Sequence, residues 1–254
     1  MPYERKIKHI LLNFDFAADE GVVLQDLTIR GPKGFNGDAS SGTCNATGKD
    51  GQDALRFNVQ ADRLVINNFT LILGEGGHGG AAETSKDCEN AVATAGHGGK
   101  PGNFKMMASE SFEIRGLFEI NPGFGGRGGQ ADAYGKNQPA SCAGTKGGDA
   151  TATSGKGGDA LQSLKSAGTV GGLGNVKILD ISAGSSGDAT AEAGSGSNGD
   201  ACGCPGGNGG KANATGGNGG SATTSGGAVT HGGDGGDTWA VAGNGGSGGS
   251  CGPD

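Results

Sequence analysis

Apolar and polar residues alternate in several separate stretches of the chain, and each such stretch predicts a β-strand. In the first stretch, residues 5–16, the apolar positions are Ile10, Leu12, Phe14 and Phe16. The same alternation appears in residues 22–30, 55–73, 104–120 and 176–181. No strand is predicted after residue 181. We therefore expect an all-β chain with little or no α-helix.

Glycine-rich stretches separate these predicted strands. Within them glycine recurs at every third position, as at Gly74, Gly77 and Gly80. Period three is the period of the polyproline-II conformation, a left-handed helix with about 3 residues per turn and a rise of about 3.1 Å. A glycine at every third residue leaves one face of such a helix bare. We therefore predict polyglycine-II rods that approach each other closely and pair through their backbones.

The two patterns alternate at an interval of about 50 residues, which is typical of a repeat protein. The predicted organisation is an N-terminal strand over residues 1–20, strand blocks with glycine-rich arms over residues 21–184, and a polyglycine-II bundle over residues 185–254. We expect the strands to stack into a β-helix-like layer from which the arms project as a bundle.

A second signature, G-x-G-G-x-A-x-A-x-G, occurs inside the arms. It appears in residues 126–135, 207–216 and, more loosely, 217–226. We interpret its alanine, serine and threonine residues as fillers where the next rod lies slightly further away. Aspartate in these arms can accept backbone N–H bonds at turns.

Composition narrows the classes of protein that fit. Glycine supplies 59 of 254 residues, while hydrophobic residues make up only 33%. The net charge of −7 argues against a nucleic-acid partner. No apolar run reaches the roughly 18 residues of a membrane-spanning helix. A secretory signal is not visible, so we expect a removed signal, another export route or release by lysis.

The cysteines are an even set of six, all in polar, glycine-rich segments. They are Cys44, Cys88, Cys142, Cys202, Cys204 and Cys251. Disulfides contribute most in chains with small apolar cores, about 2–4 kcal/mol each. We predict three disulfides and an oxidising, extracellular or cell-surface destination (or a virion), with a pairing that the sequence does not fix.

The sequence contains few motifs that would indicate a metal site, a cofactor site or a catalytic site. Residues 232–240 match the calcium-binding nonapeptide once, but such sites need tandem copies. His78, His97 and His231 each precede two glycines, and we interpret them as packing or hydrogen-bonding residues. We predict a non-enzymatic protein without a metal or cofactor. Candidate glycosylation sites are the Asn-x-Thr sequons at Asn45, Asn68 and Asn213.

The glycine registers, with segments such as residues 206–210 and 243–249, resemble polyglycine-II bundle proteins. That group includes the springtail antifreeze proteins and the tail-fibre adhesins of T-even-like phages. The resemblance covers about two thirds of the chain and is one of pattern. It implies stiff rods, and either adhesion or ice binding.

Our first hypothesis is an extracellular structural or adhesive protein, a subunit of a surface appendage or filament. Self-association would use residues 5–16 as a strand exchanged with a neighbour. A phage-type receptor-binding tip adhesin is an alternative. Partners would then be a surface receptor or glycan, contacted by aromatic residues at the arm tips, namely Phe35, Phe124, Tyr134 and Trp239, with His78 and His97.

Ice binding is an alternative from a different class. It needs a flat, regular face of small residues. The threonines that could supply it, together with the alanines between them, are Thr151, Thr153, Thr190, Thr215, Thr223 and Thr224. The interspersed charges at Asp149, Lys156, Asp188 and Lys211 would have to face elsewhere.

Overall fold

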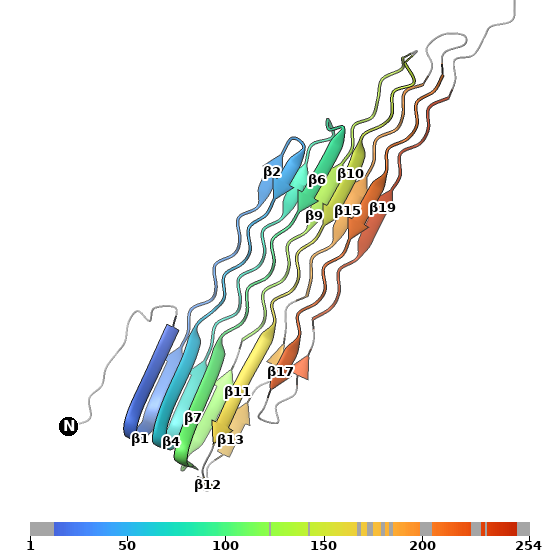
Figure 1. The fold of residues 1–254 in the computed structure, drawn as a ribbon. Helices are drawn as coiled ribbons and strands as arrows, with labels where there is room; N and C mark the ends of the chain where they lie inside the picture. The colour runs from blue at the N-terminus through green and yellow to red at the C-terminus, as the bar shows by residue number, and fades with distance from the viewer. Residues whose placement is uncertain are drawn as a thin grey trace, which may run out of the picture.

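The protein is a long, narrow all-β molecule whose segments run side by side along one axis (Figure 1). The computed structural model describes residues 13–121, 123–141, 143–166, 169–171, 175–178, 181–182, 185–198, 205–224, 230–231 and 233–247. Within these ranges there is no helix, and the paired strands are parallel. None of the described segments is therefore a helix that could cross a bilayer.

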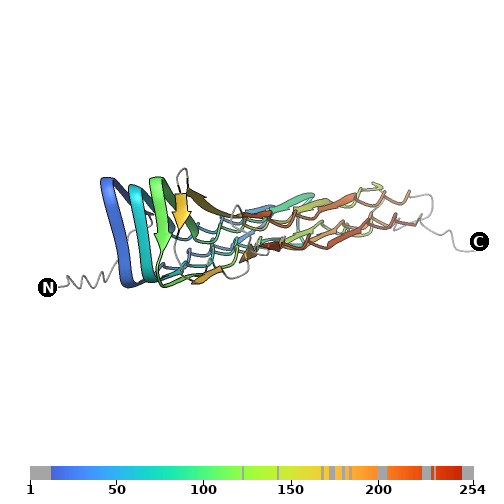
Figure 2. The same ribbon diagram turned by 90° about the horizontal axis from the view of Figure 1, so that it is seen from below.

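The chain follows a series of circuits along this axis. Each circuit leaves a wide strand region, the base, through an outward glycine-rich segment, reaches short strands at the far side, and comes back through a return segment. The outward segments form one layer and the return segments form another, as Figure 2 shows. Strands β4, β7 and β11 each begin where a return segment reaches the base.

The base is an eight-stranded sheet in which successive circuits pair in parallel. Its strands are β1 (Asn13–Arg30), β4 (Arg56–Ile72), β7 (Asn103–Ile114), β8 (Leu117–Asn121), β11 (Ala160–Ser166), β12 (Thr169–Gly171), β13 (Asn175–Ile178) and β17 (Ala222–Thr224). A separate pair joins β14 (Ile181–Ser182) to β18 (Thr230–His231). The alternation over residues 22–30, 55–73 and 104–120 thus predicted real strands.

The apolar residues of the base form one buried core. Along β4 buried side chains alternate with less buried ones, with a shift of phase after Ala61 and another after Ile66, and Leu64 and Ile66 have no exposed surface. Phe69 packs between Phe57 and Phe118, with ring centroids 5.9 and 6.0 Å away. Burying such side chains contributes about 1.5–3 kcal/mol each, so this core stabilises the base most strongly.

Two corners allow the long strands to turn inside the base. Asp26 and Asn68 have positive φ angles of 46° and 54°, in the left-handed region that Asn and Asp tolerate best among non-glycine residues. The Asn68 side-chain amide donates to Asp26 Oδ1 at 3.0 Å, and its carbonyl oxygen accepts the Leu117 N–H at 3.2 Å. β1 is thus one continuous strand with a bulge and a corner, where the sequence indicated two strands.

In the glycine-rich segments, every third residue bonds to the next circuit within the same layer. In the outward layer, the N–H groups of Gly31, Gly34 and Gly37 donate to carbonyls of residues 72, 75 and 78. In the return layer, Gly48, Gly51 and Ala54 donate to residues 94, 97 and 100. The expected period of three is therefore present as a period of hydrogen bonds.

A second set of hydrogen bonds joins the two layers. Gln52 N–H donates to Phe35 O, Gly77 N–H to Gln52 O, and Gly99 N–H to Gly77 O, at 2.7–2.8 Å. The same zigzag continues through Gly126 and Gly158. Because buried backbone groups must be paired, bonds in two directions allow these segments to be buried with almost no apolar side chains.

Glycine is required where the zigzag crosses between layers. A β-carbon on Gly77 would lie closer than 3.0 Å to the Phe35 carbonyl oxygen, and one on Gly126 equally close to Gly77 O. The corresponding residues of the first circuit are Phe35 and Gln52, which have no preceding circuit beside them. Their side chains can therefore occupy the free edge of the molecule.

The far strands form two further parallel sheets. One contains β2 (Ser40–Gly42), β5 (Ala82–Thr84), β9 (Ala131–Tyr134), β15 (Ala189–Glu192) and β19 (Thr238–Val241). The other contains β3 (Asn45–Thr47), β6 (Asn90–Thr94), β10 (Asp149–Thr153) and β16 (Ala212–Thr215). The prediction that no strand follows residue 181 is wrong, because five of the strands, β15 to β19, lie beyond it.

Alanine fills the space between these two far sheets. Ala93, Ala133, Ala152 and Ala191 have no exposed surface, and the other members of this core are also mostly alanine. The alternating alanines of the G-x-G-G-x-A-x-A-x-G signature are thus inward positions of strands, where we had interpreted them as fillers between rods. The glycine-rich segments next to the base are not free arms, because each outward segment leads into a far strand and each return segment leads back into the base.

The connections at the far side lengthen from circuit to circuit. Residues 85–89 join β5 to β6, residues 135–148 join β9 to β10, and residues 193–211 join β15 to β16. In the longer connections the glycine pattern resumes, with hydrogen bonds such as Gly147 N–H to Asn208 O and Gly196 N–H to Asn244 O. The far strands therefore lie between two glycine-rich zones, and Figure 1 shows the later circuits extending furthest.

Candidate functional site

The far sheets present two outer faces of different chemistry. We call the outer face of the β16–β10–β6–β3 sheet the threonine face, and the outer face of the β19–β15–β9–β5–β2 sheet the acidic face. Alanine occupies most inward positions of both sheets, so their outward residues carry most of the chemical variety. These two faces are the candidate binding surfaces.

The threonine face has two straight rows of side chains, fixed by the strand register. One row is made entirely of threonine and consists of Thr47, Thr94, Thr153 and Thr215. The parallel row consists of Asn45, Val92, Thr151 and Asn213. Neighbours within a row are about 4.8 Å apart and the rows are about 6.6 Å apart, from the ordinary spacing of a sheet. The result is a flat, uncharged, regular array.

Charged residues border this array. The Lys146 ammonium lies 2.7 Å from an Asp149 carboxylate oxygen, and the Lys211 backbone N–H donates to the same carboxylate at 2.7 Å. The hydrogen bond from Lys146, followed by that from Lys211, lowers the pKa of Asp149. The carboxylate is therefore held in its charged form and tied to its neighbours at the strand starts, away from the two rows.

The predicted threonines divide between different parts of the fold. Thr151, Thr153 and Thr215 lie on the threonine face, whereas Thr190 lies on the acidic face. Thr223 and Thr224 belong to β17, and their side chains are outside the described part of the chain. The sequence analysis missed Thr47 and Thr94. Their signal is the local pattern x-Ala-Thr, which occurs in four of the far strands.

The acidic face combines carboxylates with exposed aromatic residues. One row in register contains Ser41, Glu83, Asp132, Thr190 and Trp239. The next contains Tyr134, Glu192 and Val241. Partial burial raises the pKa of Tyr134, followed by the charges of Asp132, Glu192 and Glu83, so the ring sits in a negative environment. The Lys86 ammonium lies 5.1 Å from the centre of this ring, as a cation–π contact.

The four aromatic contact candidates do not form one site. Tyr134 and Trp239 share the acidic face, and Trp239 is 65% exposed. Phe35 and Phe124 are 71% and 56% exposed, but they lie in glycine-rich segments between the base and the far strands. Their expected place at arm tips is wrong, because these segments are continued by strands.

Outward polar side chains accept further backbone hydrogen bonds of the glycine-rich segments. His78 Nδ1 accepts the Arg127 N–H at 3.0 Å, and His97 Nδ1 accepts the Lys156 N–H at 2.9 Å. Asparagine and aspartate do the same elsewhere, as in Asn36 with His78 N–H. The histidine prediction of a hydrogen-bonding role is thus consistent with these contacts; His231 lies in β18, and its side chain is outside the described part.

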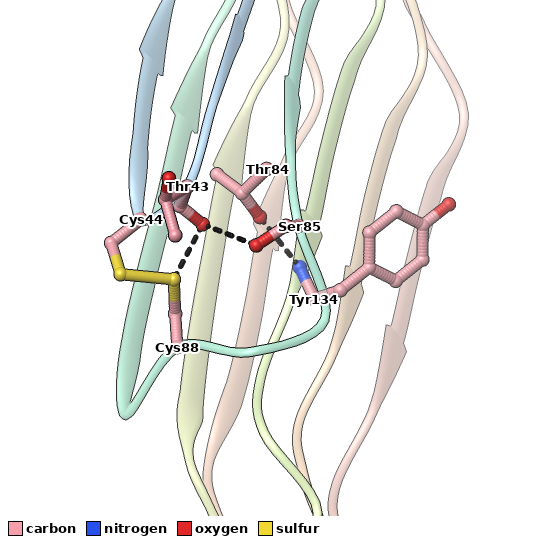
Figure 3. The surroundings of a disulfide bond; sticks show 6 residues. All are labelled: Thr43, Cys44, Thr84, Ser85, Cys88 and Tyr134. Atoms are coloured by element: carbon pink, nitrogen blue, oxygen red, sulfur yellow. Dashed lines mark hydrogen bonds between the residues drawn. A yellow bond between two sulfur atoms is a disulfide. The ribbon is translucent and has the colours of Figure 1, made fainter.

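One disulfide, between Cys44 and Cys88, joins the far turns of the first two circuits. Figure 3 shows it beside Thr43, whose carbonyl accepts the Ser85 hydroxyl at 2.9 Å, while Thr84 Oγ1 accepts the Tyr134 N–H at 3.0 Å. The other predicted disulfide residues, Cys142, Cys202, Cys204 and Cys251, lie outside the described residues.

The three sequons differ in how accessible their asparagines are. Asn45 and Asn213 are exposed and stand at the two ends of one row of the threonine face. Asn68 is also exposed, but both ends of its side-chain amide are hydrogen-bonded at the corner of the base. A glycan on Asn68 would have to break that corner.

Comparison with known proteins found no matching family model, no matching curated protein and no matching solved structure.

Proposed function

We propose that this chain is a non-enzymatic extracellular structural or adhesive protein, built as a stiff β-helix-like repeat with a polyglycine-II bundle. The observation that carries the proposal is the hydrogen-bond lattice of the glycine-rich segments, which runs both within and between layers. Such a lattice makes a rod that resists bending, because every segment is bonded to several neighbours. A rod of this kind suits holding a binding face at a distance from its attachment point.

Two further features support this function. The Cys44–Cys88 disulfide is compatible with an extracellular location. Strand β1 has β4 as its partner among the described strands, so its other edge is available for pairing with a second chain. Residues 13–16 of the proposed assembly segment 5–16 belong to β1, and residues 5–12 lie outside the described part.

Negative-stain electron microscopy over a range of concentrations tests this proposal, with and without residues 1–16. Filaments that disappear on truncation would support a subunit that assembles by strand exchange. Discrete rods in both samples would contradict the assembly and favour the phage-type tip adhesin, which binds a surface receptor or glycan as a single unit.

Ice binding is the second candidate, and the threonine face favours it. Two straight rows of small, uncharged side chains on an alanine-cored sheet form the flat, regular surface that contact with an ordered solid requires. Of the charges that counted against this function in the sequence, Asp149 borders the rows and is paired with the Lys146 ammonium, and its carboxylate also accepts the Lys211 backbone N–H.

A thermal-hysteresis assay with observation of ice-crystal shape tests this candidate. Thr94→Lys and Thr153→Lys place charges in the middle of the threonine row and are expected to abolish the activity. Thr190→Lys adds the same charge on the acidic face and is the matched control. An unmodified chain that neither shapes ice nor lowers its growth temperature would exclude ice binding.

A further inference from the structure

The acidic face has features that neither a structural rod nor an ice-binding surface uses. Trp239 and Val241 are 65% and 43% exposed on one strand, which is unusual for large apolar side chains in a chain with so few of them. Five carboxylates lie on the same face, namely Glu83, Asp132 and Glu192 on three strands, with Asp188 and Asp237 directly preceding β15 and β19. Exposed aromatic residues among charges of one sign are typical of an interaction surface.

We propose that the acidic face is a docking surface for an extended, lysine- or arginine-rich segment of a partner protein. The proposal goes beyond the structural role above and does not depend on it. Two properties define the partner segment, its positive charge and its extended form.

The charge of the face is complementary to such a segment. Glu83, Asp132 and Glu192 are the three carboxylates that influence Tyr134, and they come from three different strands. Glu83 and Glu192 are exposed. The Asp188 carboxylate fixes the neighbouring circuit by accepting the Asp237 N–H at 3.0 Å, yet the residue stays exposed to solvent. A cation approaching this sheet is therefore attracted along its whole width.

The aromatic residues give the cations a specific place to bind. A lysine ammonium already lies over an aromatic ring on this face, since Lys86 is 5.1 Å from the centre of Tyr134. Trp239 offers a larger ring, the best aromatic partner for a cation, and it has no such lysine assigned to it among the described contacts. Trp239 is next to Thr190 in the strand register, with Asp132 on the following strand.

The extent of the face favours a polypeptide over a small cation. The carboxylates extend from Glu83 on β5 to Asp237, which directly precedes β19, a width of four strands or about 14 Å at the usual strand spacing. A small ion would therefore contact only one or two of them. An extended segment places alternate side chains about 6.6 Å apart and can contact several at once. The opposite threonine face has no such charges in its two rows, so binding would be restricted to one side of the far sheets.

A fluorescein-labelled nona-lysine peptide tests the proposal by fluorescence anisotropy, at low and at high ionic strength. Trp239 is the single tryptophan of the chain, so its emission reports binding at this face directly. We expect saturable binding, a simultaneous change in Trp239 emission and strong weakening by salt. The same peptide with acetylated lysines should not bind.

Two double variants with equal changes in charge locate the site. Asp132→Asn with Glu192→Gln removes carboxylates from the acidic face, and about tenfold weaker binding is expected when charged contacts to the peptide are lost. Glu110→Gln with Glu113→Gln removes two carboxylates from β7 in the base and should leave affinity unchanged. Equal losses in both variants, or no change in Trp239 emission on binding, would overturn the proposal.

Discussion

At the scale of single residues, the absence of a side chain decides the structure of the glycine-rich segments. Gly77, Gly99 and Gly126 lie where a carbonyl oxygen of a neighbouring segment occupies the space that a β-carbon would need. Gly235 differs, because a β-carbon there would have no atom within 4 Å. Glycine thus has a steric reason at most of these positions, including Gly236 and Gly243 of the last circuit, but none at Gly235.

Gly77→Ala and Gly235→Ala test this difference. Gly77→Ala forces two backbones apart and is expected to lower the free energy of unfolding by about 3 kcal/mol. Gly235→Ala should change it by no more than about 0.5 kcal/mol, or raise it slightly by restricting the unfolded chain. Denaturant unfolding measures both, and equal effects of the two substitutions would contradict the steric explanation.

His78 connects the same lattice to pH. Its Nδ1 can accept the Arg127 N–H only in the neutral imidazole. Burial, followed by the nearby charges of Lys33 and Arg127, lowers the pKa of His78, although Glu75 opposes this. The folded state therefore binds this proton less readily than the unfolded state. The resulting stability is present above the ordinary pKa of about 6.5 and is lost as the pH falls below it.

His78→Asn isolates this effect, because asparagine keeps an acceptor oxygen, as Asn36 does in the preceding circuit. The variant should match the wild type at pH 7.5 and lose less stability at acidic pH. Thermal unfolding over a series of pH values measures the difference. Parallel curves for the two proteins would mean that His78 does not titrate against this hydrogen bond.

At the scale of elements, the strands of the base were predictable and the far strands were not. Phe57 and Val59, Leu64 and Ile66, and Phe118 and Ile120 are buried bulky residues two positions apart, and this period of two is the strongest signal for a strand. Most of the far strands alternate alanine with a polar residue, such as threonine or asparagine in β10 and β16. Alanine is depleted in strands and adds little hydrophobic contrast, so tertiary packing between the sheets decides their conformation.

Ala133→Val tests how closely the far sheets approach. Ala133 is fully buried between them, and two extra methyl groups are expected to cost about 1–3 kcal/mol through overpacking. Ala240→Val is a matched control, since Ala240 is exposed in β19, where a β-branched residue is favourable. Equal stability of the two variants would show that the sheets can separate freely.

The register that aligns the threonine row could not be found from the sequence. Thr47, Thr94, Thr153 and Thr215 are separated by unequal lengths of chain, because the far connections differ from circuit to circuit. Only the pairing of the strands shows which residues stand side by side. The neighbouring positions of Tyr134 and Glu192 on the acidic face could not be predicted either, because they also depend on the strand register.

At the scale of the whole molecule, stability is distributed unevenly along the axis. The base has a core of Phe, Leu and Ile, whereas the far sheets are held by alanine contacts and the Cys44–Cys88 disulfide. The presence of disulfides was predictable from the even number of cysteines. The pairing was not, since it depends on which far turns become neighbours.

Cys44→Ala with Cys88→Ala removes this link without affecting the other cysteines. We expect the free energy of unfolding to fall by about 2–4 kcal/mol, as for other loop-closing disulfides. Hydrogen exchange should become faster in β2, β3, β5 and β6 and stay unchanged in β4 and β7. Uniformly faster exchange would mean that the base and the far sheets unfold as one unit.

The period of three also limits how the chain could change in length. Inserting one or two residues into segment 73–81 would act like a frameshift, since each later side chain would turn to a position that a neighbouring carbonyl already fills. An insertion of three residues would keep the phase and lengthen the segment by about 9 Å, but only together with its neighbours. Length variation should therefore accumulate at the far connections, as it does in residues 85–89, 135–148 and 193–211.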